Sequence, residues 1–108
     1  MDLKRLLAVI FLCGGAWTTM AAHAEVTYSV SDGSSLEHAV VITGATGETE
    51  GVRSEYAWLS KQYPGYRPRA QSVVRNNERT FDRLEIQTAN GQLVVVYFDI
   101  TSFFGKLD

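Results

Sequence analysis

The sequence has very few of the residues that form covalent cross-links or metal sites. Among its 108 residues it has one cysteine (Cys13), two histidines and two prolines. One cysteine cannot form a disulfide within the chain, and no Cys or His cluster shows the spacing of a metal site. No serine lies in a nucleophile motif with a histidine partner. We therefore expect no catalytic residue, no metal and no cofactor, and we expect His38 to be a surface or hydrogen-bonded residue.

An excess of one charge and long apolar runs are also missing. The chain has 10 Lys and Arg against 12 Asp and Glu, a net charge of −2. So mild a charge argues against a nucleic-acid binder. Beyond the first 24 residues no apolar stretch is long enough to cross a membrane.

The first 24 residues carry a recognisable pattern. Basic Lys4 and Arg5 precede the apolar run 6–13, and "AHA" at 22–24 supplies the small residues that a signal peptidase reads. This layout is typical of a secretory signal peptide, and the run is too short to span a bilayer. We predict cleavage after Ala24 and a periplasmic or secreted protein. The remaining 25–108 would be one domain with 8 basic and 11 acidic residues, a net charge of −3.

Residues 25–108 are predicted to form a single small α+β domain. In it, one amphipathic helix packs on an antiparallel sheet of three C-terminal strands, with one or two short N-terminal strands. The helical stripe is Val52, Tyr56, Leu59 and Tyr63, closed by "PG" at 64–65 and capped by a threonine, Thr46 or Thr49. The strands are expected over 26–30, 39–43, 66–75, 79–88 and 92–101.

The two predicted hairpin turns determine which strand residues share a face. A two-residue turn at 90–91 pairs Ala89 with Gln92, and a three-residue loop at 76–78 pairs Arg75 with Arg79. Arginines and an apolar ladder then share the sheet face opposite the helix. This predicted binding surface comprises Arg67, Arg69, Arg83, Val94, Val96, Phe98 and Ile100. Its composition suits a protein interface; the alternatives are a solvated face with cross-strand ion pairs and burial of the ladder beneath other elements.

The same register sets Asp82 opposite Asp99 on the helix side. Two facing carboxylates could act as an acid–base pair or bind a hard cation. The alternative is that both lie at the end of the sheet, solvated or bonded to backbone amides.

The order of turns and strands resembles that of the PepSY and PepSY-like domains, small exported bacterial modules. The resemblance covers 52–105 and rests on "YPG", "FDRLEI", "ANG", "VVVYFD" and the later Gly105. It implies a helix on a three-stranded antiparallel sheet and a non-enzymatic periplasmic or extracellular module, in some members linked to restraint of peptidases. The chain departs from the family by the longer insert "ITSFF" between Asp99 and Gly105.

Together these observations predict an exported, non-catalytic binding or modulatory protein. The sheet face opposite the helix would contact a partner protein or a second copy of the chain. One alternative is a binder of an anionic ligand through the arginines. Another is an enzyme or cation site at Asp82 and Asp99.

Overall fold

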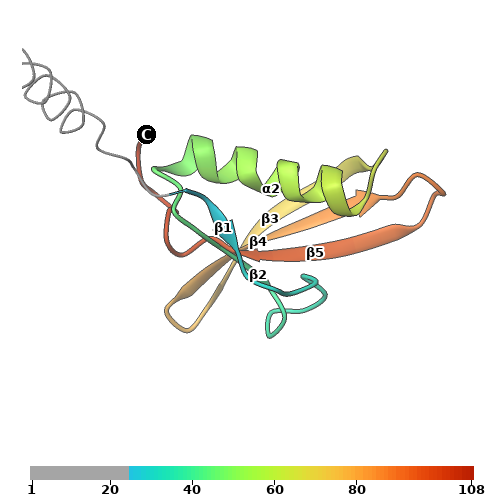
Figure 1. Cartoon of the computed structure of the whole chain (residues 1–108). Coiled ribbons are helices and arrows are strands. Elements are labelled where there is room, and N and C mark those ends of the chain that lie inside the picture. Colours follow the sequence, from blue (N-terminus) through green and yellow to red (C-terminus); the bar gives the residue numbers. More distant parts are fainter. Residues whose placement is uncertain (1–24) are drawn as a thin grey trace, which may run out of the picture.

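The computed structural model describes residues 25–108, so the predicted signal peptide over 1–24 lies outside the described residues. The described chain forms one helix and a five-stranded, mostly antiparallel sheet, which confirms the α+β class (Figure 1). The elements in chain order are β1 (Thr27–Tyr28), β2 (Val40–Thr43), α2 (Glu48–Gln62), β3 (Arg67–Asn76), β4 (Arg79–Gln87) and β5 (Leu93–Asp99).

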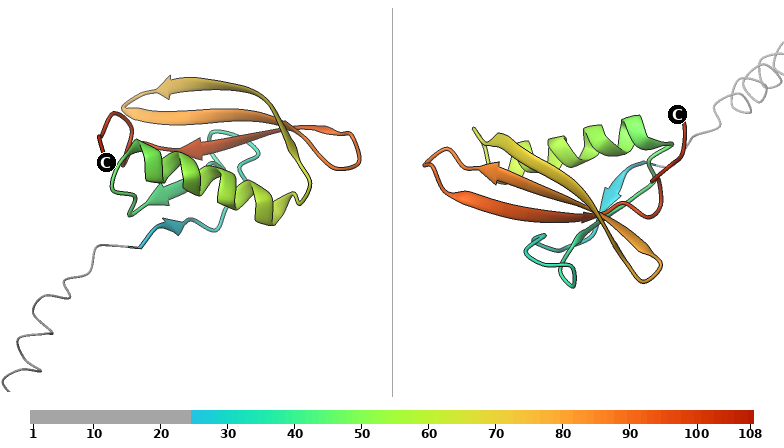
Figure 2. Two further views of the ribbon diagram at one scale, coloured as in Figure 1. Left: turned by 90° about the horizontal axis from the view of Figure 1, so that it is seen from above. Right: turned by 180° about the vertical axis from the view of Figure 1, so that it is seen from behind.

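The strands lie in the order β1-β2-β5-β4-β3, and only β2 and β5 run parallel. Figure 2, seen from above, shows α2 over the β2 and β5 part of the sheet, while β3 lies beyond it. Accordingly, every residue of β3 except the half-buried Val74 is exposed. The core therefore sits between α2, β2, β4 and β5.

The predicted helical stripe is confirmed around Leu59. Leu59 is fully buried, and half-buried Tyr56 and Tyr63 pack against the same core. The predicted threonine cap is wrong, because Gly47 occupies the cap position without a side-chain bond. The Asp108 carboxylate instead accepts the backbone N–H groups of Thr49 and Glu50, at 2.7 and 2.9 Å.

Both hairpin turns differ from the prediction by one residue. The β4–β5 loop has three residues, 89–91, because Gly91 takes a left-handed conformation (φ 92°) and Thr88 N–H bonds to the carbonyl of Gln92 at 2.8 Å. The β3–β4 loop has two, because Asn77 takes a left-handed conformation and Asn76 pairs with Arg79. Leu84 consequently lies opposite Val96, and Asp82 lies opposite Phe98.

A shift of one residue moves every side chain of a strand to the other face. The apolar ladder of β5 therefore faces α2 together with β4 residues. The buried core is made of Val40, Ile42, Leu59, Leu84, Ile86, Val96, Phe98, Ile100 and Phe103.

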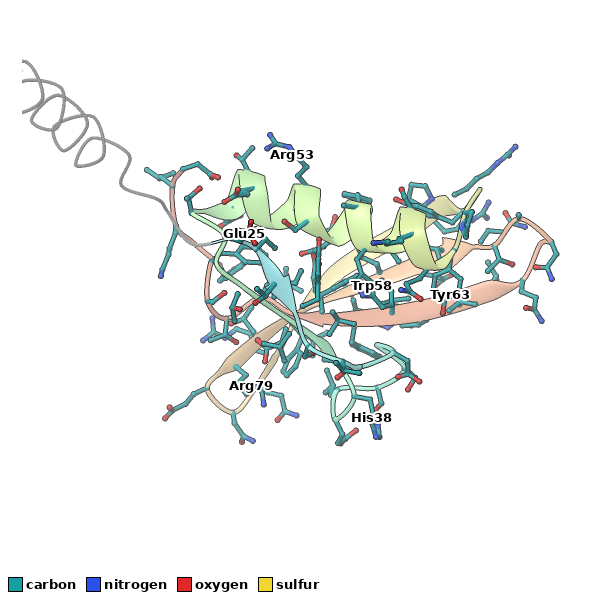
Figure 3. All side chains as sticks on the ribbon, in the orientation of Figure 1. Glu25, His38, Arg53, Trp58, Tyr63 and Arg79 are labelled. Carbon is teal, nitrogen blue, oxygen red and sulfur yellow. The ribbon has the colours of Figure 1, made fainter. Side chains whose placement is uncertain are left out.

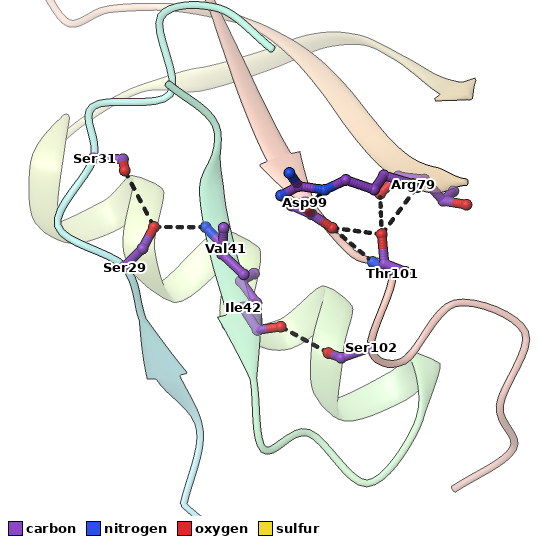
Figure 4. Close-up of polar contacts among 9 residues, drawn as sticks. Ser29, Ser31, Val41, Ile42, Arg79, Asp99, Thr101 and Ser102 are labelled. Atoms are coloured by element: carbon purple, nitrogen blue, oxygen red, sulfur yellow. Dashed lines mark hydrogen bonds and ion pairs between the residues drawn. The ribbon is translucent and has the colours of Figure 1, made fainter. Parts of the chain in front are cut away.

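The segment after β5 folds back as a turn beneath the start of α2. Phe103 fills the space beside Gly51, and the hydroxyl of Ser102 donates to the carbonyl oxygen of Ile42 at 2.7 Å (Figure 4). Phe104, its neighbour, is 40% exposed. Within 25–108, no helix has the length and apolar character needed to span a membrane.

Candidate functional site: a groove beside Trp58

The structure does not assemble the predicted binding surface. Val96 and Phe98 are 0% exposed and Ile100 is 3% exposed, while half-buried Val94 packs against the same core. The prediction that these residues form an exposed ladder opposite the helix is wrong. The ladder is buried because the β4–β5 turn has three residues and not two, which places the ladder under α2.

The arginines of that predicted surface stay on the outside, apart from the ladder. Arg83 lies on the face away from α2, with its Nη1 atom 4.0 Å from Oε1 of Glu85. Arg67 lies opposite Gln87, and Arg69 stands at an irregularity between Pro68 and Ala70. The apolar ladder predicted to lie beside these arginines is buried on the α2 side of the sheet.

Asp82 and Asp99 do not face each other either. In the observed register Asp82 lies opposite Phe98, and Phe81 lies opposite Asp99, so the two carboxylates occupy different faces of the sheet. The predicted carboxylate pair is therefore wrong, again because of the turn length.

Asp99 holds the end of β5 in place. It accepts hydrogen bonds from Nε of Arg79 (2.7 Å), the N–H of Thr101 (3.0 Å) and the hydroxyl of Thr101 (2.6 Å), as Figure 4 shows. Burial by itself would raise the pKa of Asp99, but the bonds from Thr101 and Arg79 hold it below its ordinary value of 3.8. A carboxylate so fully engaged serves the fold rather than proton transfer.

Asp82 is buried between the sheet and the helix. Nε2 of Gln71 on β3 donates to both of its oxygens, at 2.9 and 2.8 Å. From the other side comes Glu55 of α2, which is 0% exposed. Glu55 was not among the site residues predicted from the sequence, although its position between Val52 and Leu59 places it on the buried side of the helix.

No group of three or more His, Cys, Asp or Glu residues that could hold a metal ion occurs in the described part of the chain. His38 is exposed, and its Nδ1 atom lies 3.0 Å from the hydroxyl of Ser35.

A concave surface lies beside α2, where the helix faces residues 28–32. Two cavities of about 270 and 340 Å³ separate the C-terminal half of the helix from the chain at 28–32, and they share Trp58 and Gln62. We call this pair of cavities the Trp58 groove. Its other lining residues are Tyr28, Ser29, Val30, Ser31, Asp32, Ala57, Lys61 and Tyr63.

The aromatic wall of the groove is fixed by the core. The ring of Trp58 stands edge-on to Phe98, with centroids 5.4 Å apart, and lies 6.4 Å from Tyr63. Figure 3 shows Trp58 and Tyr63 between the helix and the sheet. The hydroxyl of Tyr28 donates to the carbonyl oxygen of Ser54 at 2.8 Å, which ties β1 to the helix. Both walls of the groove are therefore held in position.

The opposite wall is the edge of the sheet. Ser29 N–H bonds to the carbonyl oxygen of Val41 at 2.9 Å, and Val41 N–H bonds to the hydroxyl of Ser29 at 2.8 Å (Figure 4). Because neighbouring residues of an antiparallel strand direct their backbone groups to opposite sides, the N–H and C=O of Tyr28 point to the outer edge. The Trp58 groove thus combines packed aromatic rings with a strand edge that no other strand of residues 25–108 pairs with.

No protein family, curated protein or solved structure matches this chain. The resemblance to PepSY-like domains therefore stays a prediction, based on the turn and strand pattern of 52–105. By its fold and its groove, this protein is a small α+β domain with a cleft between its helix and a sheet edge.

Proposed function

We propose that this protein is an exported, non-catalytic binding protein that holds an extended segment of a partner protein in the Trp58 groove. The observation that carries the proposal is the position of the two cavities, between the Trp58 ring, which packs edge-on to Phe98, and the outer edge of β1, which no other strand of residues 25–108 pairs with.

Recognition would follow the strand-addition mode, in which a peptide pairs with an exposed sheet edge and places side chains in adjacent pockets. The outward N–H and C=O of Tyr28 supply the main-chain bonds. The cavities on either side of Trp58 suit single apolar or aromatic side chains rather than a large cofactor. Lys61 borders one cavity, so an acidic side chain in the bound segment is favoured there.

The other functions considered from the sequence have less support. Joint catalysis by Asp82 and Asp99 would require two groups on opposite faces of the sheet to act at one site. An anionic-ligand site built on Arg67, Arg69 and Arg83 has less support, because the pairing of β3 with β4 shifts between Pro68 and Ala70, where Arg69 lies. The groove is the better candidate because its walls are both concave and fixed.

Peptide selection with a blocking variant tests the proposal. A random peptide library displayed on phage is selected on the purified protein, and binding is then measured with Ala57→Arg and Ser60→Arg. Ala57 is exposed and lines the groove, while Ser60 is exposed on the same helix and lines neither cavity. Both variants add the same charge to the same helix.

We expect the selected peptides to lose at least tenfold in affinity for Ala57→Arg and to bind Ser60→Arg as they bind the parent protein. Equal binding by the two variants, or no enrichment of any peptide, would contradict the proposal. Assembly of the protein with itself, seen by sedimentation and abolished by Ala57→Arg, would replace the partner with a second copy.

A further inference from the structure

Glu55 presents a buried polar group that neither the fold nor the groove explains. Its side chain is fully buried, and neither carboxyl oxygen has a hydrogen-bond partner among residues 25–108. Leaving an ionised carboxylate in such a place is costly, because burial removes its hydration without replacing it.

The group beside Glu55 is another acid. Asp82 of β4 is 1% exposed, and its carboxylate is the neighbouring charge that, after burial, raises the pKa of Glu55. Two ionised carboxylates that neighbour each other in the core would repel, and a hydrogen bond can form between them only when one holds a proton. Gln71 already donates to both oxygens of Asp82, whereas no residue among 25–108 donates to either oxygen of Glu55. The proton therefore belongs on Glu55.

We propose that Glu55 and Asp82 form a carboxyl–carboxylate pair that holds one proton between helix α2 and strand β4, and that the fold is weakened when rising pH removes this proton. The site binds only a proton, and the proposal does not depend on partner binding in the Trp58 groove.

Within residues 25–108, neither Glu55 nor Asp82 takes part in an ion pair that would stabilise two negative charges. The titratable neighbours that interact with this pair are Tyr56 on α2 and, through Tyr56, Tyr66 after the helix. The core residues that β2 and β5 contribute beneath α2 are apolar, among them Ile42, Val96 and Phe98. The neighbour that β3 contributes is the uncharged side chain of Gln71, which donates to Asp82.

The direction of the pH effect follows from the pKa of Glu55. Burial first, and then the neighbouring Asp82 carboxylate, raise this pKa from an ordinary 4.5 to about 10. A group whose pKa is higher in the folded state binds more protons when folded. Its stabilising effect is complete below pH 4.5 and declines as pH rises toward 10.

Infrared spectroscopy tests the proton directly. At pH 7 in heavy water, ordinary carboxyl groups are ionised, whereas the purified protein should show the carbonyl stretch of one protonated carboxylic acid. Glu55→Gln should lack this band. A parent spectrum without the band at pH 7 would overturn the proposal without requiring any variant to fold.

Unfolding measured from pH 5 to pH 9 tests the consequence. The unfolding equilibrium constant of the parent should rise by up to about tenfold per pH unit, as one proton requires. Glu55→Gln, whose amide can donate to Asp82 at every pH, should lose most of this slope. Glu78→Gln, which removes an exposed carboxylate of the β3–β4 loop, should keep it.

An unchanged slope in Glu55→Gln would overturn the proposal. Stabilisation of the parent but not of Glu55→Gln by millimolar Ca²⁺ or Mg²⁺ would overturn it as well, because the pair would then hold a cation rather than a proton.

Discussion

Leu59 is the helical residue that most directly joins α2 to the core. Its side chain is fully buried among β-strand residues. Leu59→Ala should lower the free energy of unfolding by about 2–5 kcal/mol, through lost burial and the cavity left behind. Urea denaturation measures this, with exposed Ser60→Ala as a control near zero. A loss below about 1 kcal/mol would show that α2 does not pack as described.

Phe98 tests the residue-level consequence of the turn length. Because Phe98 is 0% exposed and faces α2, Phe98→Glu would bury an unpaired charge and should unfold the domain. Leu93→Glu, on the same strand at a position 62% exposed, should remain folded. Circular dichroism melts of the two variants provide the comparison. A cooperatively folded Phe98→Glu protein would contradict the observed register.

At the scale of elements, the contact between α2 and the C-terminal turn depends on Gly51. A Cβ atom at this position would overlap the ring of Phe103. Gly51→Ala should therefore destabilise by about 1–3 kcal/mol through overpacking, although alanine is favoured over glycine in a helix by about 1 kcal/mol. Thermal melts decide between the two effects. Phe103→Leu in the same chain should recover part of the loss, whereas a stabilised Gly51→Ala protein would contradict the contact.

The elements also show how far the sequence determines this structure. The spacing of Tyr56, Leu59 and Tyr63 predicted the helix, and alternation predicted the strands. The face of each strand could not be derived from alternation, since that depends on turn length. Left-handed Asn77 and Gly91 made one turn shorter and the other longer than predicted, and the apolar ladder of the predicted surface became part of the core.

The Trp58 groove could not be predicted for a different reason. The sequence shows Trp58 on the flank of the helical stripe, but the groove exists only because the chain at 28–32 returns beside α2. That placement depends on long-range contacts, such as the bond from Tyr28 to Ser54, that no local pattern encodes. Glu55 was visible as an acid on the buried side of the helix, and Asp82 was predicted on the helix side of the sheet, but the predicted register set Asp82 opposite Asp99 and so hid its relation to Glu55.

At the scale of the whole molecule, export is the first prediction. The basic start, the apolar run and "AHA" at 22–24 predict removal of residues 1–24. Intact-mass measurement of protein recovered from the periplasm or medium of an expressing bacterium should give a chain that begins at Glu25. Recovered protein that retains residues 1–24 would contradict the prediction.

The central claim is that a partner segment lies between α2 and the free edge at β1. The most direct measurement is amide hydrogen exchange by NMR, with and without a peptide selected on the protein. The account predicts slower exchange at the outward N–H of Tyr28, together with shifted resonances around Trp58, and no change along β3. Protection along β3, or binding that leaves Tyr28 and Trp58 unaffected, would contradict it.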